Sequence, residues 1–430
     1  MRIPTRLLLR LLVALLVLLA LAAVAVVVLN RRGEEPLPDA PVAQAPATPD
    51  QVARGAYLAR AGNCASCHSA PGGAPYAGGV AVPTPFGAIY AGNLTPDPAT
   101  GIGRWSGAQF WRALHNGRSA DGRLLYPAFP YTNYTEVTRG DADALFAFLR
   151  SQPAVQQANR APDLRFPYNT QAALAVWRAL YFRPGSTPAD PAQTAEWNRG
   201  AYLVRSLGHC SACHSPRNAL GASADAGELR GGLIAAQDWY APSLRAAAEA
   251  GVAQWSADEV VELLRTGVNR HAGVMGPMAE VVFNGSQYLS EPDLRAMATY
   301  LRALPPLPAP APRAVPVAAR VLDRGKELYR QQCAQCHGDQ GEGQPGRYPA
   351  LAGNRAVLLA EPANLLQAIL HGGFAPATAG NPRPYGMPPF AQALEDADVA
   401  AVASFVRLSW GNQAGGVAPL EVYRIRDSVR

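Results

Sequence analysis

The sequence predicts a mainly α protein in which three tandem domains follow an N-terminal transmembrane helix. Three observations support this prediction: a five-residue pattern occurs three times, an uncharged apolar run lies near the N-terminus, and proline-rich segments separate the repeats. We therefore expect the following segments: 1–32, a membrane anchor or signal sequence; 33–50, a linker; 51–182, a first domain; 194–304, a second domain; 305–318, a proline-rich linker; 319–412, a third domain; and 413–430, a C-terminal tail.

The N-terminal segment has the composition of a membrane span. Three arginines precede an apolar run over residues 11–29, which Asn30 and two further arginines close. As a helix this run spans about 28 Å, close to the thickness of a bilayer's hydrocarbon core. A cleaved signal usually has a shorter apolar region, although residues 20–25 resemble cleavage sites. An uncleaved anchor and a removed signal peptide both stay open, and both imply that the rest of the chain is exported.

The repeated pattern is Cys-x-x-Cys-His, and its three copies contain all six cysteines of the chain: Cys64, Cys67 and His68; Cys210, Cys213 and His214; Cys333, Cys336 and His337. This is the attachment signature of a c-type haem, in which two thiols add across the vinyl groups and the histidine becomes the proximal iron ligand. A structural zinc site needs a fourth ligand, and none lies near any copy. A thioredoxin-like dithiol would not explain a histidine after every second cysteine. The pattern therefore predicts three covalently bound haem c groups, which suits an exported chain because this haem is attached outside the bacterial inner membrane.

Composition excludes several other functions. The net charge of +6 comes almost wholly from arginine, and no basic run is interleaved with aromatic residues, so we expect no nucleic-acid partner. The chain has no recognisable pair of catalytic carboxylates, nucleophile motif or nucleotide-binding glycine loop. We therefore predict no catalytic residues, and place the chemistry in the irons. With 430 residues, the chain is long enough for two or three ordinary domains.

Each repeat is expected to open and close with a helix. The openings share an Arg-Gly pair, at residues 54–55, 199–200 and 324–325. The first two repeats also contain the pattern of a helix capping box, at Ser106 with Gln109 and at Ser256 with Glu259. Apolar residues at helical spacing close each repeat, for example between 294 and 301 and between 399 and 406. Terminal helices that pack across a haem are typical of class I cytochrome c domains, and no sustained strand alternation is visible.

The second axial ligands can be sought among five methionines. An electron-transfer haem works best with both axial positions filled, and methionine opposite histidine raises its potential. Met278 and Met387 each precede the closing helix of their repeat, so we predict that they bind iron, as do His68, His214 and His337. The alternative is that these methionines fill gaps in the core, and Met275 could substitute for Met278.

The first repeat departs from this pattern. Phe129 takes the place of the methionine, and no methionine lies between Met1 and Met275. The first iron is then open and five-coordinate, or is bound by His115, or receives a ligand from another domain or chain. His371 lies in a matching stretch of the third repeat, where Met387 already supplies a ligand, and this favours a non-ligand role for both histidines.

With these motifs the chain resembles a known family, the triple-haem cytochrome c subunits of membrane-bound bacterial dehydrogenases. That family serves quinoprotein alcohol dehydrogenases and flavin-dependent gluconate or sorbitol dehydrogenases. The resemblance covers residues 51 to 426, and the strings that carry it are 197–203, 208–218, 276–282, 293–301 and 409–412. It implies that the subunit takes electrons from a catalytic partner and passes them to membrane ubiquinone, with Met278 and Met387 as axial ligands. Phe129 looks more like the relatives that serve molybdenum-containing aldehyde or N-heterocycle dehydrogenases.

Together these features predict a periplasmic, membrane-tethered cytochrome that is not itself an enzyme. It would relay electrons from a quinoprotein, flavoprotein or molybdoprotein dehydrogenase subunit to ubiquinone or the respiratory chain. One alternative is an open first haem with peroxidase-like or ligand-binding activity, and another is a redox shuttle without a fixed partner. Because electrons tunnel only over short distances, we also expect the domains to pack together or to be gathered by the partner.

Overall fold

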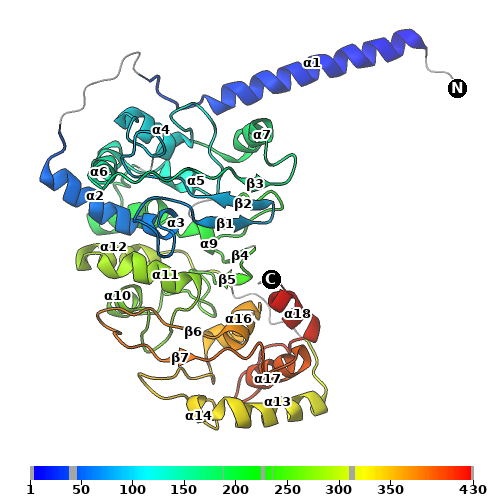
Figure 1. The fold of residues 1–430 in the computed structure, drawn as a ribbon. Coiled ribbons are helices and arrows are strands. Elements are labelled where there is room, and N and C mark those ends of the chain that lie inside the picture. Colours follow the sequence, from blue (N-terminus) through cyan, green and yellow to red (C-terminus); the bar gives the residue numbers. More distant parts are fainter. Residues whose placement is uncertain are drawn as a thin grey trace.

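The structure is a computed structural model that describes residues 4–37, 46–186, 188–223, 228–234, 236–308 and 315–427. Parts of five predicted segments therefore lie outside the described residues: the first three residues of the anchor, short stretches of the second domain, and portions of both linkers and of the C-terminal tail. The described chain is mainly helical (Figure 1). We call the part from α2 to α7 repeat 1, the part from α8 to α12 repeat 2, and the part from α13 to α18 repeat 3.

One pair of helices recurs in each repeat, as the sequence predicted. The pairs are α2 (Pro49–Ala61) with α6 (Arg139–Arg150), α8 (Ala195–Arg205) with α12 (Glu291–Arg302), and α13 (Ala319–Gln332) with α17 (Asp396–Leu408). Each pair borders its own cluster of buried apolar side chains.

A glycine at each crossing lets the two helices touch through their backbones. A Cβ atom added to Gly55 would lie 1.9 Å from the carbonyl oxygen of Ala144, and one on Gly200 would lie 1.9 Å from that of Ala296. In repeat 3 the distance from Gly325 to the oxygen of Ala401 would be 2.2 Å. No side chain fits at these distances, which explains why all three openings carry glycine.

The arginine before each glycine pairs with an aspartate of the closing helix. Arg54 Nε donates to Asp141 Oδ1 over 2.8 Å, Arg199 Nη2 lies 2.7 Å from Asp293 Oδ2, and Arg324 Nε lies 2.8 Å from Asp398 Oδ1. The Arg-Gly pair thus does two jobs at one crossing: the glycine permits the approach and the arginine fixes the rotation of the helices.

Shorter elements complete the repeats. The three Cys-x-x-Cys-His segments form single helical turns, α3 (Cys64–His68), α9 (Ser211–His214) and α14 (Ala334–His337). Helices α4 (Gly107–Asn116) and α10 (Ala257–Thr266) begin with the two predicted capping boxes, which the structure confirms. The remaining helices are α5 (Tyr131–Tyr134), α7 (Gln171–Tyr181), α11 (Pro277–Asn284), the 3₁₀ helix η1 (Ser286–Tyr288), α15 (Arg355–Leu358), α16 (Ala363–His371) and α18 (Pro419–Asp427).

Small antiparallel strands lie in the loops. In repeat 1, β1 (Ala81–Thr84) pairs with β2 (Gly87–Tyr90), which also pairs with β3 (Asp163–Leu164). Repeat 2 contains β4 (Gly232–Ile234) and β5 (Trp239–Ala241), and repeat 3 contains β6 (Gly373–Phe374) and β7 (Gly386–Met387). Strands this short do not produce a recognisable alternation of apolar and polar residues, so they could not be predicted from the sequence.

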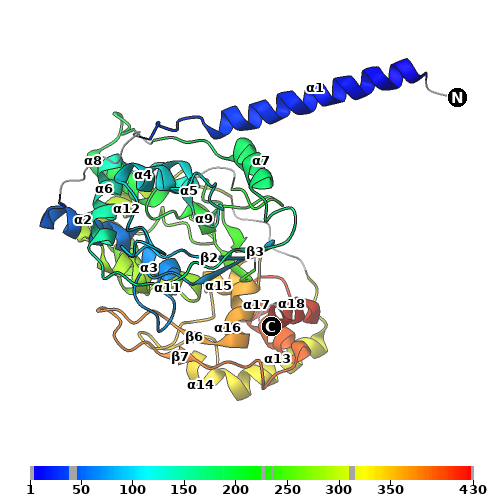
Figure 2. The same cartoon turned by 45° about the horizontal axis from the view of Figure 1, so that its top comes forward.

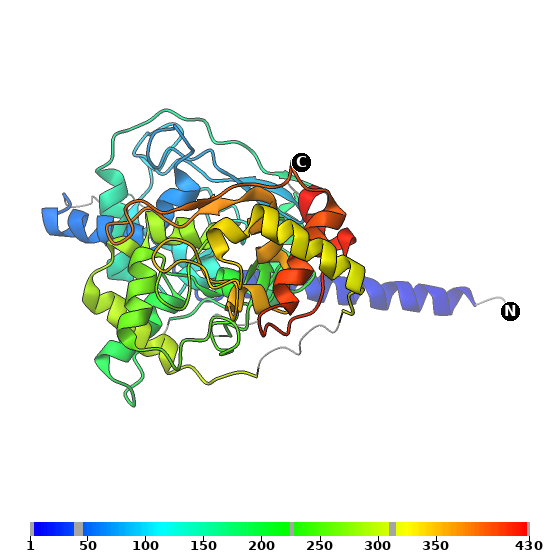
Figure 3. The same cartoon turned by 90° about the horizontal axis from the view of Figure 1, so that it is seen from below.

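The N-terminal helix α1 (Thr5–Asn30) stands apart from the repeats. The most apolar 18-residue stretch of this helix has a mean hydropathy of 3.4, and none of that stretch is buried. The length and composition of the helix therefore suit a membrane span. Figure 3 shows it projecting from one side of the body that the three repeats form. Its last turn packs against α7 of repeat 1 (Figures 1 and 2).

Candidate haem-attachment sites

Each Cys-x-x-Cys-His turn lies within a few residues of the end of the opening helix of its repeat. The two cysteines of each pair lie on the same short turn. Burial raises the pKa of the Cys64 and Cys210 thiols to about 12. A redox-active dithiol needs a lowered pKa instead, so the structure argues against the thioredoxin-like alternative.

Each of the three histidines makes the same kind of hydrogen bond, from its Nδ1 to a backbone carbonyl, and this bond orients the ring. Nδ1 of His68 lies 2.7 Å from the carbonyl oxygen of Gly92, and Nδ1 of His214 lies 2.7 Å from that of Pro242. Nδ1 of His337 lies 2.9 Å from the carbonyl oxygen of Pro349. A carbonyl can only accept, so the proton is on Nδ1 and Nε2 is left with a lone pair for a metal. Iron- and zinc-binding histidines are commonly held in this way.

The donor set fits a c-type haem. Burial lowers the pKa of all three imidazoles, which keeps them neutral and able to bind iron. Among the described residues, no three His, Cys, Asp or Glu side chains are grouped as ligands of a bare metal ion. A haem brings four nitrogens of its own, so two thiols and one neutral imidazole are what the protein must supply.

Met387 lies where a second ligand for the third haem is predicted. It pairs with Gly373 between β7 and β6, and its side chain packs against the core of repeat 3. Two residues earlier, the ring of Tyr385 packs at 5.2 Å against that of Tyr348, whose hydroxyl hydrogen-bonds Cys336. The Met387 segment is thereby tied to the third attachment motif.

Met278 lies in the first turn of α11, and its position is linked to that of His214. Gly276, with φ +55°, lies against the ring of Trp239, where a Cβ would come within 2.5 Å of the ring. Trp239 begins β5, and the carbonyl that holds His214 belongs to Pro242 just after this strand. The alternative candidate, Met275, instead points its Sδ-methyl towards Gly373 of repeat 3.

In repeat 1 an aromatic cluster takes the place of the methionine. The ring of Phe129 lies 5.3 Å from that of Tyr134 and 6.4 Å from that of Tyr131, and it packs, as Cys64 does, against the core of repeat 1. His115 stacks on Trp111 at 4.5 Å and hydrogen-bonds the backbone of Thr135, and its Nδ1 has no hydrogen-bond partner among the described residues. The non-ligand role of His115 therefore stays a prediction.

A reciprocal exchange of hydrogen bonds, which was not predicted from the sequence, joins repeats 1 and 2. Tyr57 of repeat 1 donates to Asp293 Oδ2 of repeat 2 over 2.6 Å, and Tyr202 of repeat 2 donates to Asp141 Oδ2 of repeat 1 over 2.7 Å. Burial raises the pKa of both phenols, that of Tyr202 to about 12, so both stay protonated donors. The repeated string Arg-Gly-Ala-Tyr-Leu contained this signal; repeat 3 has Glu327 in place of the tyrosine and lacks the contact.

The same interface brings the first two attachment motifs together. Asn284 of repeat 2 donates to Ser66 inside the first motif over 2.9 Å, and Asn133 of repeat 1 donates to Ser211 inside the second over 2.8 Å. Burial raises the pKa of the Cys67 thiol, and the nearby carboxylate of Glu280 in repeat 2 raises it further. Side chains of repeat 2 therefore reach both the serine and a cysteine of the first motif.

Repeat 3 is joined to repeat 2 by backbone-directed amides. Asn364 Nδ2 donates to the oxygen of Tyr240 over 2.8 Å, and Gln367 Nε2 donates to that of Gln237 over 3.0 Å. Thr378 Oγ1 adds a bond of 3.1 Å to the oxygen of Thr266. The expectation that the domains pack together is thus met by the described structure.

Comparison with known proteins places these features in a family. A cytochrome c family model matches residues 52–153 and 322–410. The chain is 38% identical over 405 residues to the cytochrome c subunit of quinone-dependent alcohol dehydrogenase from Gluconacetobacter polyoxogenes, covering 89% of this chain and 86% of the relative. It is also 38% identical over 381 residues to the gluconate 2-dehydrogenase cytochrome c subunit of Pantoea cypripedii, covering 84% and 86%. Identity to one of the subunits of nicotinate dehydrogenase from Pseudomonas putida is 44% over 378 residues, which cover 84% of this chain and 31% of that protein.

The Tyr–Asp exchange should hold repeats 1 and 2 together. We expect Tyr57→Phe and Tyr202→Phe each to lower the free energy of unfolding by about 2 kcal/mol, the usual contribution of a hydrogen bond to a charged group. Denaturant unfolding of the haem-loaded protein measures this. Tyr423→Phe, at an exposed position on α18, is the matched control and should leave stability unchanged. Equal unfolding midpoints for all three variants would contradict the assigned role.

Proposed function

Because the chain belongs to the family of cytochrome c subunits of bacterial dehydrogenase complexes, we propose that it holds three haems that relay electrons from a periplasmic dehydrogenase subunit to ubiquinone or the respiratory chain. Membership makes the chain an electron-transfer subunit with covalently bound haem c, and not the catalytic subunit. The observation that carries the number three is the repeated set of two thiols and one carbonyl-oriented imidazole.

In this proposal each repeat contains one class I cytochrome c domain, with the boundaries 51–182, 194–304 and 319–412. Cys64, Cys67, Cys210, Cys213, Cys333 and Cys336 bind the porphyrins, His68, His214 and His337 bind the irons, and Met278 and Met387 fill two sixth positions. The haems supply one-electron transfer. The protein's part is to orient the imidazoles, to keep them neutral, and to hold the sites at fixed separations through the two interfaces between repeats.

The partner is proposed to be a dehydrogenase catalytic subunit, and two classes are supported. The alcohol and gluconate dehydrogenase relatives favour a quinoprotein or flavoprotein. Phe129 and the 44% identity to a nicotinate dehydrogenase chain favour a molybdenum-containing dehydrogenase for aldehydes or N-heterocycles. The apolar, unburied helix α1 supports attachment to the inner membrane, with the repeats on the periplasmic side.

The haem number can be measured directly. The exported wild-type chain should bind three haems by pyridine haemochrome assay and by intact mass, and the variant Cys333→Ala/Cys336→Ala should bind two. Ala334→Ser changes the same motif without removing a thiol, so it should keep three. A wild-type chain without covalent haem would refute the relay.

The relay itself predicts a stable partner. The tagged full-length chain, extracted from its own membranes in mild detergent, should retain a large dehydrogenase subunit, and addition of that enzyme's substrate should reduce the haems. The partner's cofactor, whether pyrroloquinoline quinone, flavin or molybdenum, then decides between the two classes. A chain that purifies alone, with its haems unaffected by the co-extracted enzymes, would favour the unattached shuttle.

A second candidate function concerns repeat 1 alone. In the described part of repeat 1 no methionine is present, and Phe129 lies in the corresponding place with Tyr131 and Tyr134. The phenyl ring of Phe129 has no lone pair with which to bind iron, so this arrangement favours an open iron with ligand-binding or peroxidase-like activity.

Carbon monoxide distinguishes an open iron in the first haem from one whose sixth position is filled. We expect the reduced wild type to bind carbon monoxide at a single haem, and Phe129→Met to bind none because the thioether fills the sixth position. Phe166→Met, at a side chain that is 82% exposed, is the control and should bind like the wild type. Absence of binding in the wild type would show that another group already coordinates this iron.

A further inference from the structure

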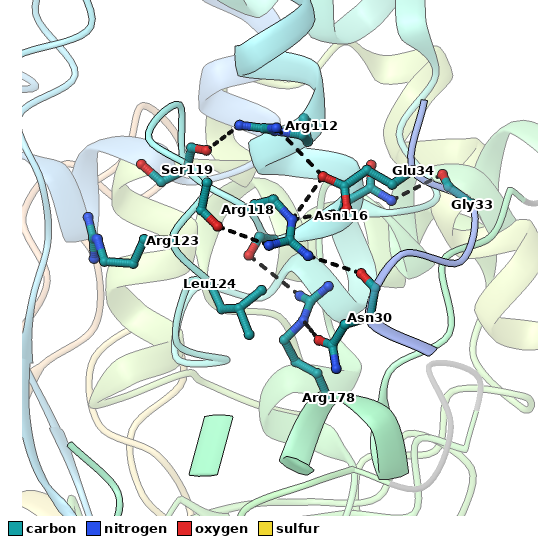
Figure 4. A network of polar contacts seen from close by, with 12 residues as sticks. Asn30, Gly33, Glu34, Arg112, Asn116, Arg118, Ser119, Arg123, Leu124 and Arg178 are labelled. Atoms are coloured by element: carbon teal, nitrogen blue, oxygen red, sulfur yellow. Dashed lines mark hydrogen bonds and ion pairs between the residues drawn. The ribbon is translucent and has the colours of Figure 1, made fainter. Parts of the chain in front are cut away.

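The end of α1 is fixed to repeat 1 and does not lead directly into a free linker. Asn30 Nδ2 donates to the oxygen of Ala175 in α7 over 2.9 Å, while Arg178 Nε donates to Asn30 Oδ1 over 2.9 Å (Figure 4). Arg118 Nη2 donates to the backbone carbonyl oxygen of Asn30 over 3.1 Å. Asn30 and Arg178 are 8% and 3% exposed, so this junction is buried.

The next residues continue the junction. Glu34 lies 2.8 Å from Arg118 Nε and 3.7 Å from Arg112 Nη1, and Asn116 Nδ2 donates to the oxygen of Gly33 over 3.2 Å (Figure 4). The first residues of the predicted linker, Gly33 and Glu34, are therefore bound to repeat 1. A glutamate and several donors of repeat 1 set the direction in which α1 leaves the body.

Helix α7, which α1 contacts, exposes apolar side chains and no charge. Its sequence, QAALAVWRALY, contains no acidic residue, and its one charged residue, Arg178, is turned inward beside the buried Leu174. Beyond the first turn the exposed positions are apolar: Val176 is 48% exposed, Leu180 58% and Tyr181 36%. A surface helix in water normally places its charges outward.

The surroundings extend this surface. Phe166, in the loop before α7, and Leu220, whose oxygen accepts a hydrogen bond from Trp177 Nε1, add further exposed apolar area. Arg31 and Arg32 follow α1, Arg183 follows α7, and all three are exposed. An apolar stripe bordered by arginines is complementary to an anionic phospholipid surface.

We propose that the outward stripe of α7, formed by Val176, Leu180 and Tyr181, lies in the headgroup–acyl boundary of the bilayer that α1 crosses. Packed helices have axes about 8–10 Å apart, so when α1 spans the membrane, α7 lies beside the point where α1 emerges. Interfacial helices bury their apolar face about 5–10 Å deep, which this geometry allows. The proposal rests on the proposed membrane anchor, and adds to it that repeat 1 meets the membrane in one fixed orientation.

The consequence concerns the order of the relay. With α1 and α7 both at the membrane, repeat 1 is the repeat held against the bilayer, and repeats 2 and 3 follow from it through the interfaces described above. An electron path that ends at a membrane quinone would then end at repeat 1.

Photocrosslinking of the haem-loaded full chain tests this. p-Benzoylphenylalanine is placed at position 180, at position 16 within α1, or at position 233, where Leu233 on β4 is 47% exposed and serves as the matched control. Each variant is irradiated in nanodiscs of phosphatidylcholine and phosphatidylglycerol and digested. Mass spectrometry should find phospholipid adducts on the peptides of positions 16 and 180, with at least tenfold less at position 233.

The outcomes separate the two proposals. Adducts at position 16 with none at position 180 would overturn the role of α7 and leave the anchor intact. No adduct at either position would overturn the anchor, and the role of α7 with it. Crosslinks from position 180 to a second polypeptide would show that a protein covers this surface, and would also overturn the proposal.

Discussion

The backbone contact between the first and last helix of each repeat is the constraint on which the rest depends. Gly55, Gly200 and Gly325 bring the opening helix against a carbonyl of the closing helix, at a distance where no other residue fits. The arginine beside each glycine then pairs with an aspartate, and the attachment turn begins where the opening helix ends. One crossing thus sets the place of the thiols and of the histidine that follows them in all three repeats.

The same crossings become contact surfaces in repeats 1 and 2. The aspartates that bind the arginines still have oxygens to offer, and Tyr57 and Tyr202 reach across to use them. Leu207 of repeat 2 is buried in the core of repeat 1, which makes the two repeats one packed body. Electron transfer between haems needs short, constant distances, and shared cores supply these better than flexible linkers do. Repeat 3, with Glu327 at the tyrosine position, is held instead by amide side chains on loop carbonyls.

Repeat 1 differs from its neighbours at two sites. Phe129 replaces a methionine beside the predicted haem, and α7 adds a helix whose outer face is apolar. Both differences concern the repeat that binds the end of α1. A haem with a different second ligand has a different potential, so the first site would be the one tuned separately from the other two.

The sequence by itself determined the covalent chemistry. The cysteine and histidine positions and the capping boxes are local patterns, because each depends on residues a few positions apart. Comparison of the three repeats then indicated Met278 and Met387 as ligand candidates, the gap at Phe129 and the helix pairs. The tertiary structure alone decided which carbonyls orient the histidines and which aspartates accept the hydrogen bonds of Tyr57 and Tyr202. It also decided that repeat 1 binds Asn30 and Glu34, and that Arg178 faces inward while Leu180 faces outward. These features join residues far apart in the chain, and no periodicity records which distant surfaces will meet once the helices have crossed.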